Sequence, residues 1–152
     1  HNLNDKTHLM LQHDHGFADG VITPLGVKDA EWYGINMHLT YDVNENLTAG
    51  IRAEWFRDQD GFRVWSPGRI AAATNSAGVS YAGNFTSWSS PSSYYAITAG
   101  LNWKPATWLN IRPNVRYDWA DGKDALTGGG YRPFGNNKQD QFLFSTDFSV
   151  TF

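Results

Sequence analysis

Arg112 and Arg116 carry the clearest chemical signal in this chain of 152 residues. They are four positions apart, so a β-strand would hold both guanidinium groups on one face. A guanidinium group stays charged and offers several fixed donors to carboxylates and phosphates. Asp118, Glu54 and Asp147 lie on the polar side of segments with alternating polarity. These charges could pair with one another and rigidify a wall, or together produce a field that orients and selects solutes.

Histidines near the start of the chain raise the question of metal binding. His13 and His15, in LQHDHG, would lie about 6.6 Å apart on one strand face. That is close enough to share a metal with His8 or an acid, while solvated histidines at a rim are the alternative. The acid and glycine spacing of RDQDG and DWADGKD suggests calcium loops, but neither completes the EF-hand pattern. We predict no metal site and no cofactor.

Other kinds of chemistry have little support in the sequence. A nucleophile motif such as G-x-S-x-G does not occur, and the serines of SWSSPSS have no histidine near them in the chain. The glycine run at 128–130 follows no strand-then-helix pattern that could cradle a phosphate. With a net charge of −3 and no cluster of Lys and Arg, nucleic acid is not an expected partner. We predict that the protein is not an enzyme.

Alternation of apolar and polar residues defines the elements that would position these charges. Six segments show the pattern, the first of them more weakly: 7–14, 33–43, 47–55, 95–104, 109–119 and 141–152. Most have about the 9 to 11 residues that a tilted strand needs to cross a bilayer. No run of about 18 apolar residues occurs, so a transmembrane helix is not predicted. The sequence therefore predicts about six transmembrane strands.

The connections between these strands alternate in length. Those at 44–46 and 105–107 are tight turns, whereas the long ones cover about 14–31, 58–93 and 120–140. Short turns at one end and long loops at the other are the layout of an outer-membrane barrel. We therefore predict an all-β fold, in which an antiparallel meander forms a transmembrane β-barrel.

In such a barrel the polar faces meet the lumen and the apolar faces meet lipid. The predicted pore-lining residues are His38, Asp42, Arg52, Glu54, Arg112, Asn114, Arg116, Asp118 and Asp147. Aromatic side chains gather at both strand ends, as expected where a barrel wall meets the headgroups. The predicted membrane-interface aromatic residues are Trp32, Tyr33, Tyr41, Trp55, Tyr95, Trp103, Trp108, Tyr117 and Trp119. A soluble sandwich, the alternative, has no reason to band its aromatic residues at both ends.

The final segment, FLFSTDFSVTF, resembles the C-terminal sorting signal of Gram-negative outer-membrane proteins. This resemblance implies recognition by the barrel-assembly machinery, with Phe148, Val150 and Phe152 as the assembly signal. The order of the segments also resembles the C-terminal part of the OmpL-like β-barrel porin-2 family, most specifically in LNWKPATWLNIRPNVRYDW and RDQDG. The family implies a bacterial outer-membrane location, with outer-membrane lipid and lipopolysaccharide as partners.

The predicted strand number is too small for a closed wall, because single-chain barrels begin at about eight strands. We therefore expect residues 1–152 to be the C-terminal portion of a single larger barrel. A hairpin hidden in 58–93, in which FRVW pairs with VSYAG, and a barrel shared by several chains are the alternatives. Pro113 lacks an amide hydrogen, so we also expect a bulge or a break in the ladder there.

Two functions fit this layout. The first is a porin for passive diffusion of small hydrophilic solutes or ions, in which the mid-strand Arg112 and Arg116 predict a weak anion preference. The second is a structural or partner-binding barrel, whose long outer loops or wall dock another component. Loop 58–93 motivates the second function through its large apolar side chains. These are Phe62, Val64, Trp65, Tyr81, Phe85 and Trp88.

Overall fold

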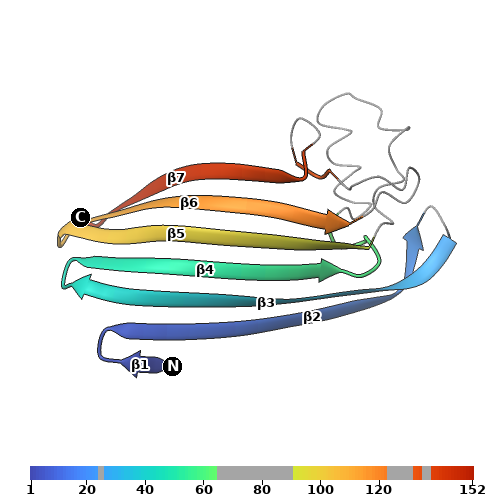
Figure 1. The fold of residues 1–152 in the computed structure, drawn as a ribbon, viewed down its shortest axis with the longest axis horizontal. Coiled ribbons are helices and arrows are strands. Elements are labelled where there is room, and N and C mark those ends of the chain that lie inside the picture. Colours follow the sequence, from blue (N-terminus) through green and yellow to red (C-terminus); the bar gives the residue numbers. More distant parts are fainter. Residues whose placement is uncertain (24–25, 65–90, 123–131, 135–137) are drawn as a thin grey trace.

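Seven strands make up the described part of the chain in a computed structural model (Figure 1). The structure describes residues 1–23, 26–64, 91–122, 132–134 and 138–152. The strands are β1 (Asn2–Asn4), β2 (Thr7–Thr23), β3 (Gly26–Asn44), β4 (Leu47–Asp58), β5 (Ser92–Ala106), β6 (Leu109–Gly122) and β7 (Asp140–Val150). They form one sheet in chain order, and every neighbouring pair is antiparallel. The predicted all-β meander is confirmed, with the short β1 in addition to the six predicted strands.

The sheet is open within the described residues. Figure 1 shows β7 at one edge, and β1 with β2 at the other. The turns that follow β1, β3 and β5 lie at one end of the strands, and the connections that follow β2, β4 and β6 lie at the opposite end. An open antiparallel meander of this kind is consistent with part of a β-barrel.

The prediction of a long loop at about 14–31 is wrong. β2 and β3 continue to pair as far as Thr23 and Gly26, with a bulge between Ala18 and Val21. Gly20 has a φ of 61° there, which glycine adopts without strain, and its amide donates to Asp29 Oδ1 at 2.9 Å. In this segment the backbone groups of β2 and β3 hydrogen-bond to each other. The hairpin can therefore continue beyond the rest of the sheet without burying an apolar face.

The other two predicted loops are described only in part. Most of 58–93 lies outside the described residues, including the proposed hairpin of FRVW and VSYAG. The loop predicted at 120–140 begins later, because β6 continues to Gly122, and 123–131 with 135–137 lie outside the described residues.

The polarity of the sheet is reversed relative to that of a soluble protein. Ile51 and Ile97, on the apolar face, are 51% and 49% exposed, whereas Asp118, on the polar face, is only 7% exposed. The buried apolar residues of the described part are three alanines: Ala30, Ala96 and Ala120. The large apolar side chains therefore form an outer surface and not a core.

The apolar face is not smooth. Ala49 and Ala99 are small residues on adjacent strands, and they stand between larger side chains such as Leu101 and Val115. An open hollow of about 610 Å³ results, and it is lined mainly by residues of the apolar face. Its walls offer few polar atoms, so it suits a hydrocarbon neighbour better than a hydrophilic solute.

The predicted break at Pro113 is confirmed between β5 and β6. Their pairing passes from Gly100 with Asn114 directly to Trp103 with Ile111, so the positions opposite Pro113 and Arg112 are unpaired in the ladder. On its other side, Pro113 pairs with Thr146 in an uninterrupted register with β7. The missing amide donor therefore interrupts one ladder and leaves the other intact.

Gly16 provides a test of the packing at the loop end of the polar face. A Cβ atom at Gly16 would overlap the indole ring of Trp32, its cross-strand partner, whereas a Cβ atom at Gly50 would meet Thr40 Cγ2 at an ordinary 3.4 Å. We predict that Gly16→Ala lowers the free energy of unfolding by about 1–3 kcal/mol, because the ring must move. Thermal unfolding in detergent measures this. Gly50→Ala is the matched control, and an equal loss in both variants would contradict the prediction.

Candidate functional site

Short side chains on β5 determine how the polar face is assembled. On this face β5 presents Ala96, Thr98 and Gly100 in succession, between β4 and β6. These residues leave space that long side chains from the neighbouring strands can fill, and Ala96 is accordingly only 3% exposed. Glu54 of β4 and Arg116 of β6 therefore meet across β5, although two strand spacings, about 10 Å, separate their backbones.

A chain of charge-assisted hydrogen bonds crosses the sheet from β4 to β7. Arg52 Nη2 donates to Glu54 Oε1 at 2.6 Å, and Arg116 Nη1 donates to Glu54 Oε2, also at 2.6 Å. Arg116 Nε donates to Asp118 Oδ1 at 2.7 Å, and Gln141 Nε2 donates to Asp118 Oδ2 at 2.9 Å. Both oxygens of each carboxylate accept a hydrogen bond, so two positive and two negative charges balance within this central network.

Two further contacts lie between the central network and the short turns. Arg112 Nε donates to Asp147 Oδ1 at 2.7 Å, and the two side chains are 52% and 54% exposed. Ser145 Oγ donates to Asn114 Oδ1 at 2.9 Å. Water and salt screen an exposed ion pair strongly, so the Arg112–Asp147 pair stabilises the fold less than the central network does.

Asp42 links three strands at the turn end of β3, beyond the aromatic side chain of Tyr41. Thr48 Oγ1 of β4 donates to Asp42 Oδ1 at 2.7 Å, and Nε2 of His8 on β2 lies 3.0 Å from Asp42 Oδ2. The hydrogen bond from Thr48, followed by that from His8, lowers the pKa of Asp42 below its ordinary value because both stabilise the carboxylate.

The register places every predicted pore-lining residue on one face of the sheet. His38 lies beside Arg52 in this arrangement, outside the central network. The sequence did not place His8 or Gln141 among the predicted pore-lining residues, although both contact predicted residues. Gln141 shares its parity with Asp147, which is the signal that could have found it, whereas the weak alternation of 7–14 gave little reason to choose His8.

Aromatic side chains of the apolar face meet across the strands near the loop end. Trp55, Tyr95 and Trp119 fall in one register row, and the rings of Tyr95 and Trp119 stack with centroids 5.1 Å apart. On the same face Trp103 follows Tyr95 by eight residues toward the short turn. Eight residues of strand span about 26 Å along the strand, which a tilt of about 40° reduces to about 20 Å of height, somewhat less than the band of about 25 Å in an outer-membrane barrel.

Trp32 is an exception among the predicted interface residues, because it lies on the polar face. It pairs with Gly16 and Asp58, while its neighbour Tyr33 takes the apolar face with Trp55. The prediction for Trp32 was wrong because it relied on nearness to the strand end and not on the alternation of faces. The indole ring instead packs against residues at the start of loop 58–93.

The start of loop 58–93 folds back onto the polar face. Phe62 and Trp32 have ring centroids 6.3 Å apart, and the guanidinium carbon of Arg63 lies 5.6 Å from the Trp32 ring centre. Phe62 was among the residues predicted to dock a partner, but it packs within the chain. Of the other loop residues in that prediction, Trp65, Tyr81, Phe85 and Trp88 lie outside the described residues.

Asp58 holds this first part of the loop. It is fully buried, and Val64 donates its amide hydrogen to Asp58 Oδ2 at 2.8 Å. Burial raises the pKa of Asp58, while hydrogen bonds from the backbone of Val64, Arg63 and Phe62 act in the opposite direction. The RDQDG segment thus uses its first aspartate to bind the backbone of its own loop.

The candidate metal ligands are not gathered into a site within the described ranges. No group of three or more His, Cys, Asp or Glu side chains there could hold a metal ion. His13 and His15 have ring centroids 6.3 Å apart, and His15 Nε2 lies 2.8 Å from Glu31 Oε1.

The described residues also contain no helix with the length and apolar character needed to cross a bilayer.

Comparison with known families identifies the kind of protein to which this polar face belongs. The model of the family described as beta-barrel porin-2, OmpL-like, matches residues 1–152. The chain belongs to this family. The resemblance in the sequence is confirmed, and the polar face is the candidate functional site of this OmpL-like family member. The comparison with curated proteins found no match, and neither did the comparison with solved structures.

Arg116 should contribute more to stability than Arg112. Arg116→Met removes the cation that Glu54 and Asp118 share, and these two side chains are only 22% and 10% exposed. We predict a loss of about 1–3 kcal/mol, the range for hydrogen bonds to charged groups. Arg112→Met, the matched control, removes an exposed pair and should lose at most about 1 kcal/mol. Urea unfolding of the two variants in detergent compares them, and a larger loss at Arg112 would refute the ranking.

The lowered pKa of Asp42 gives a second prediction. Because the folded pKa lies below the unfolded one, Asp42 stabilises the fold above the ordinary aspartate pKa, and this contribution disappears as the pH falls through the folded pKa. Thr48→Val removes the strongest hydrogen bond to the carboxylate and should raise the pKa of Asp42 toward its ordinary value. Titration of the carboxyl carbon by NMR measures this shift. Thr40→Val, also on the polar face, is the control, and an unchanged pKa in Thr48→Val would contradict the assignment.

Proposed function

We propose that the chain forms part of the wall of a bacterial outer-membrane pore, through which small hydrophilic solutes or ions diffuse passively. Its membership of the OmpL-like β-barrel porin-2 family supports this proposal. The observation that carries it is the reversed polarity of the sheet, with large apolar side chains exposed on one face and charged residues hydrogen-bonded on the other. Such an apolar surface is unfavourable in water and favourable in hydrocarbon.

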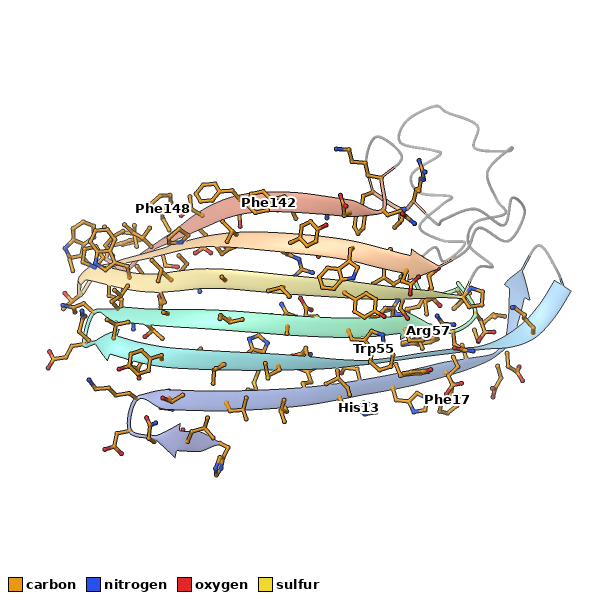
Figure 2. All side chains as sticks on the ribbon, viewed as in Figure 1. His13, Phe17, Trp55, Arg57, Phe142 and Phe148 are labelled. Atoms are coloured by element: carbon orange, nitrogen blue, oxygen red, sulfur yellow. The ribbon has the colours of Figure 1, made fainter. Side chains whose placement is uncertain are left out.

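The aromatic rows support the same placement. Trp55, Tyr95 and Trp119 lie at the loop end of the apolar face, and Tyr41 and Trp103 lie toward the short turns. Rings of this kind favour the level of the headgroups, so the apolar stretch between the two rows spans the hydrocarbon. Figure 2 shows Phe142 and Phe148 along β7, where 67% and 63% exposure leaves both rings available to lipid.

A complete pore needs a closed wall. Within the described residues β7 has an unpaired edge, and so has the part of β2 beyond its short pairing with β1; such edges are unfavourable in a bilayer because backbone groups there find no water. Additional strands close the wall in this proposal.

The ion pairs support a nearly unselective wall in this part of the pore. Arg52, Arg112 and Arg116 each pair with a carboxylate, and Glu54, Asp118 and Asp147 balance them in number. Sequence reasoning favoured a weak anion preference because the arginines lie in mid-strand. These pairs lie within β4 and β6, across β5, and between β6 and β7, so in this proposal the charges balance locally and contribute little net field across the pore.

Conductance tests both the pore and the role of these arginines. In a planar bilayer the protein should give stepwise currents, and the absence of any current from folded protein would overturn the proposal. The double variant Arg112→Gln with Arg116→Gln leaves the carboxylates uncompensated, so its reversal potential in a salt gradient should shift toward cation preference.

Arg57→Gln is the matched control for this measurement, because Arg57 lies on the apolar face and should not affect selectivity. Circular dichroism of each variant confirms that the sheet is formed. A conducting double variant with an unchanged reversal potential would show that Arg112 and Arg116 do not line the conducting path.

A further inference from the structure

Arg57 has different partners from the arginines of the polar face. Its Nε donates to Gln59 Oε1 at 2.9 Å, and its Nη1 lies 3.4 Å from Ser93 Oγ. Both partners are neutral, and Arg57 forms no ion pair within the part of the chain that the structure describes. Its charge is therefore held in place without being neutralised.

The position of Arg57 is at the upper border of the apolar face. It follows Trp55 by two residues on β4, so both side chains lie on that face, and Figure 2 shows them near the loop end of the strand. The register places Tyr33 on one side of Arg57 and Ser93 on the other. Since Trp55 belongs to the aromatic row at headgroup level, Arg57 lies just outside the hydrocarbon.

Charge is distributed unevenly along this border. On the β2 side, His15 falls in the same row as Tyr33 and Arg57, and Glu31, on the same face of β3, lies 2.8 Å from His15. On the opposite side, Asp121 on β6 pairs with Ser93. Asp121 lies two strand spacings from Arg57, about 10 Å. The carboxylates of Glu31 and Asp121 therefore flank Arg57 at this border, and the guanidinium group itself is the position that favours a negatively charged group.

The geometry points to a binding site for the phosphate of a membrane-lipid headgroup, formed by Arg57 with Tyr33 and Ser93 beside it. A guanidinium group has five N–H donors, and Gln59 and Ser93 engage two of them, so others remain for phosphate oxygens. The lipid's acyl chains lie along the apolar face below Trp55, which a free phosphate cannot use. This inference rests on the orientation of the sheet in the proposed function.

Lipid-dependent stability tests the site. The full chain, folded in detergent, is titrated with the diphosphorylated glycolipid lipid A in mixed micelles, and the thermal transition is followed by gel mobility. We expect lipid A to raise the transition temperature of the wild-type protein. Arg57→Gln should bind lipid A about tenfold more weakly, because it loses the charge-assisted hydrogen bonds to phosphate. Arg57→Lys should retain part of the effect, and Arg112→Gln, on the opposite face, should retain all of it.

Three results would overturn the inference. They are an unchanged shift in Arg57→Gln, an equal shift from lipid A lacking its phosphates, and an equal shift from inorganic phosphate at the same concentration. The last of these would identify a free-anion site in place of a lipid site. Failure of the proposed pore is separate, because it appears as an absence of bilayer current from the wild-type protein whatever the lipid titration gives.

Discussion

The pairing of strand backbones within one sheet is the constraint on which the rest of the structure depends. Along most of their length β3, β4, β5 and β6 have a hydrogen-bonded neighbour on both sides, so few of their backbone groups need water. Side chains then alternate between two faces with no intermediate option. The strict alternation of the sequence therefore converts directly into one apolar face and one polar face.

The polar face obtains its order from side-chain length and not from burial of apolar surface. Ala96 and Gly100 on β5 are covered from both sides, and Arg116 reaches Glu54 only because no bulky side chain stands between them. The carboxylates of Glu54 and Asp118 each use both oxygens, which holds the arginines in one geometry. The charges of this face therefore balance within it, and it carries little net charge.

The fold and the two faces could be predicted from the sequence because both follow from a local period of two residues. The lengths of the strands were harder to predict. A hairpin such as that of β2 and β3 satisfies its own backbone amides, so it can continue through residues of loop-like composition, among them Gly16 and Gly20. Contacts between strands depend on register, which a single strand does not encode. Register alone determines two features: the space that the short side chain of Ala96 leaves between β4 and β6, and the contact of His8 with Asp42.

Register also explains why the charged residues can stabilise a specific sheet although several of their pairs are partly exposed. A shift of one residue between β5 and β6 would move Arg116 and Asp118 to the apolar face and bring Tyr117 and Trp119 to the polar face. A shift of two residues would preserve the faces, but it would carry Arg116 away from Glu54 and leave Oε2 of this part-buried carboxylate without its donor. Alternation therefore excludes the odd shifts and the central network disfavours the even ones, so the two signals together select a single alignment of the strands.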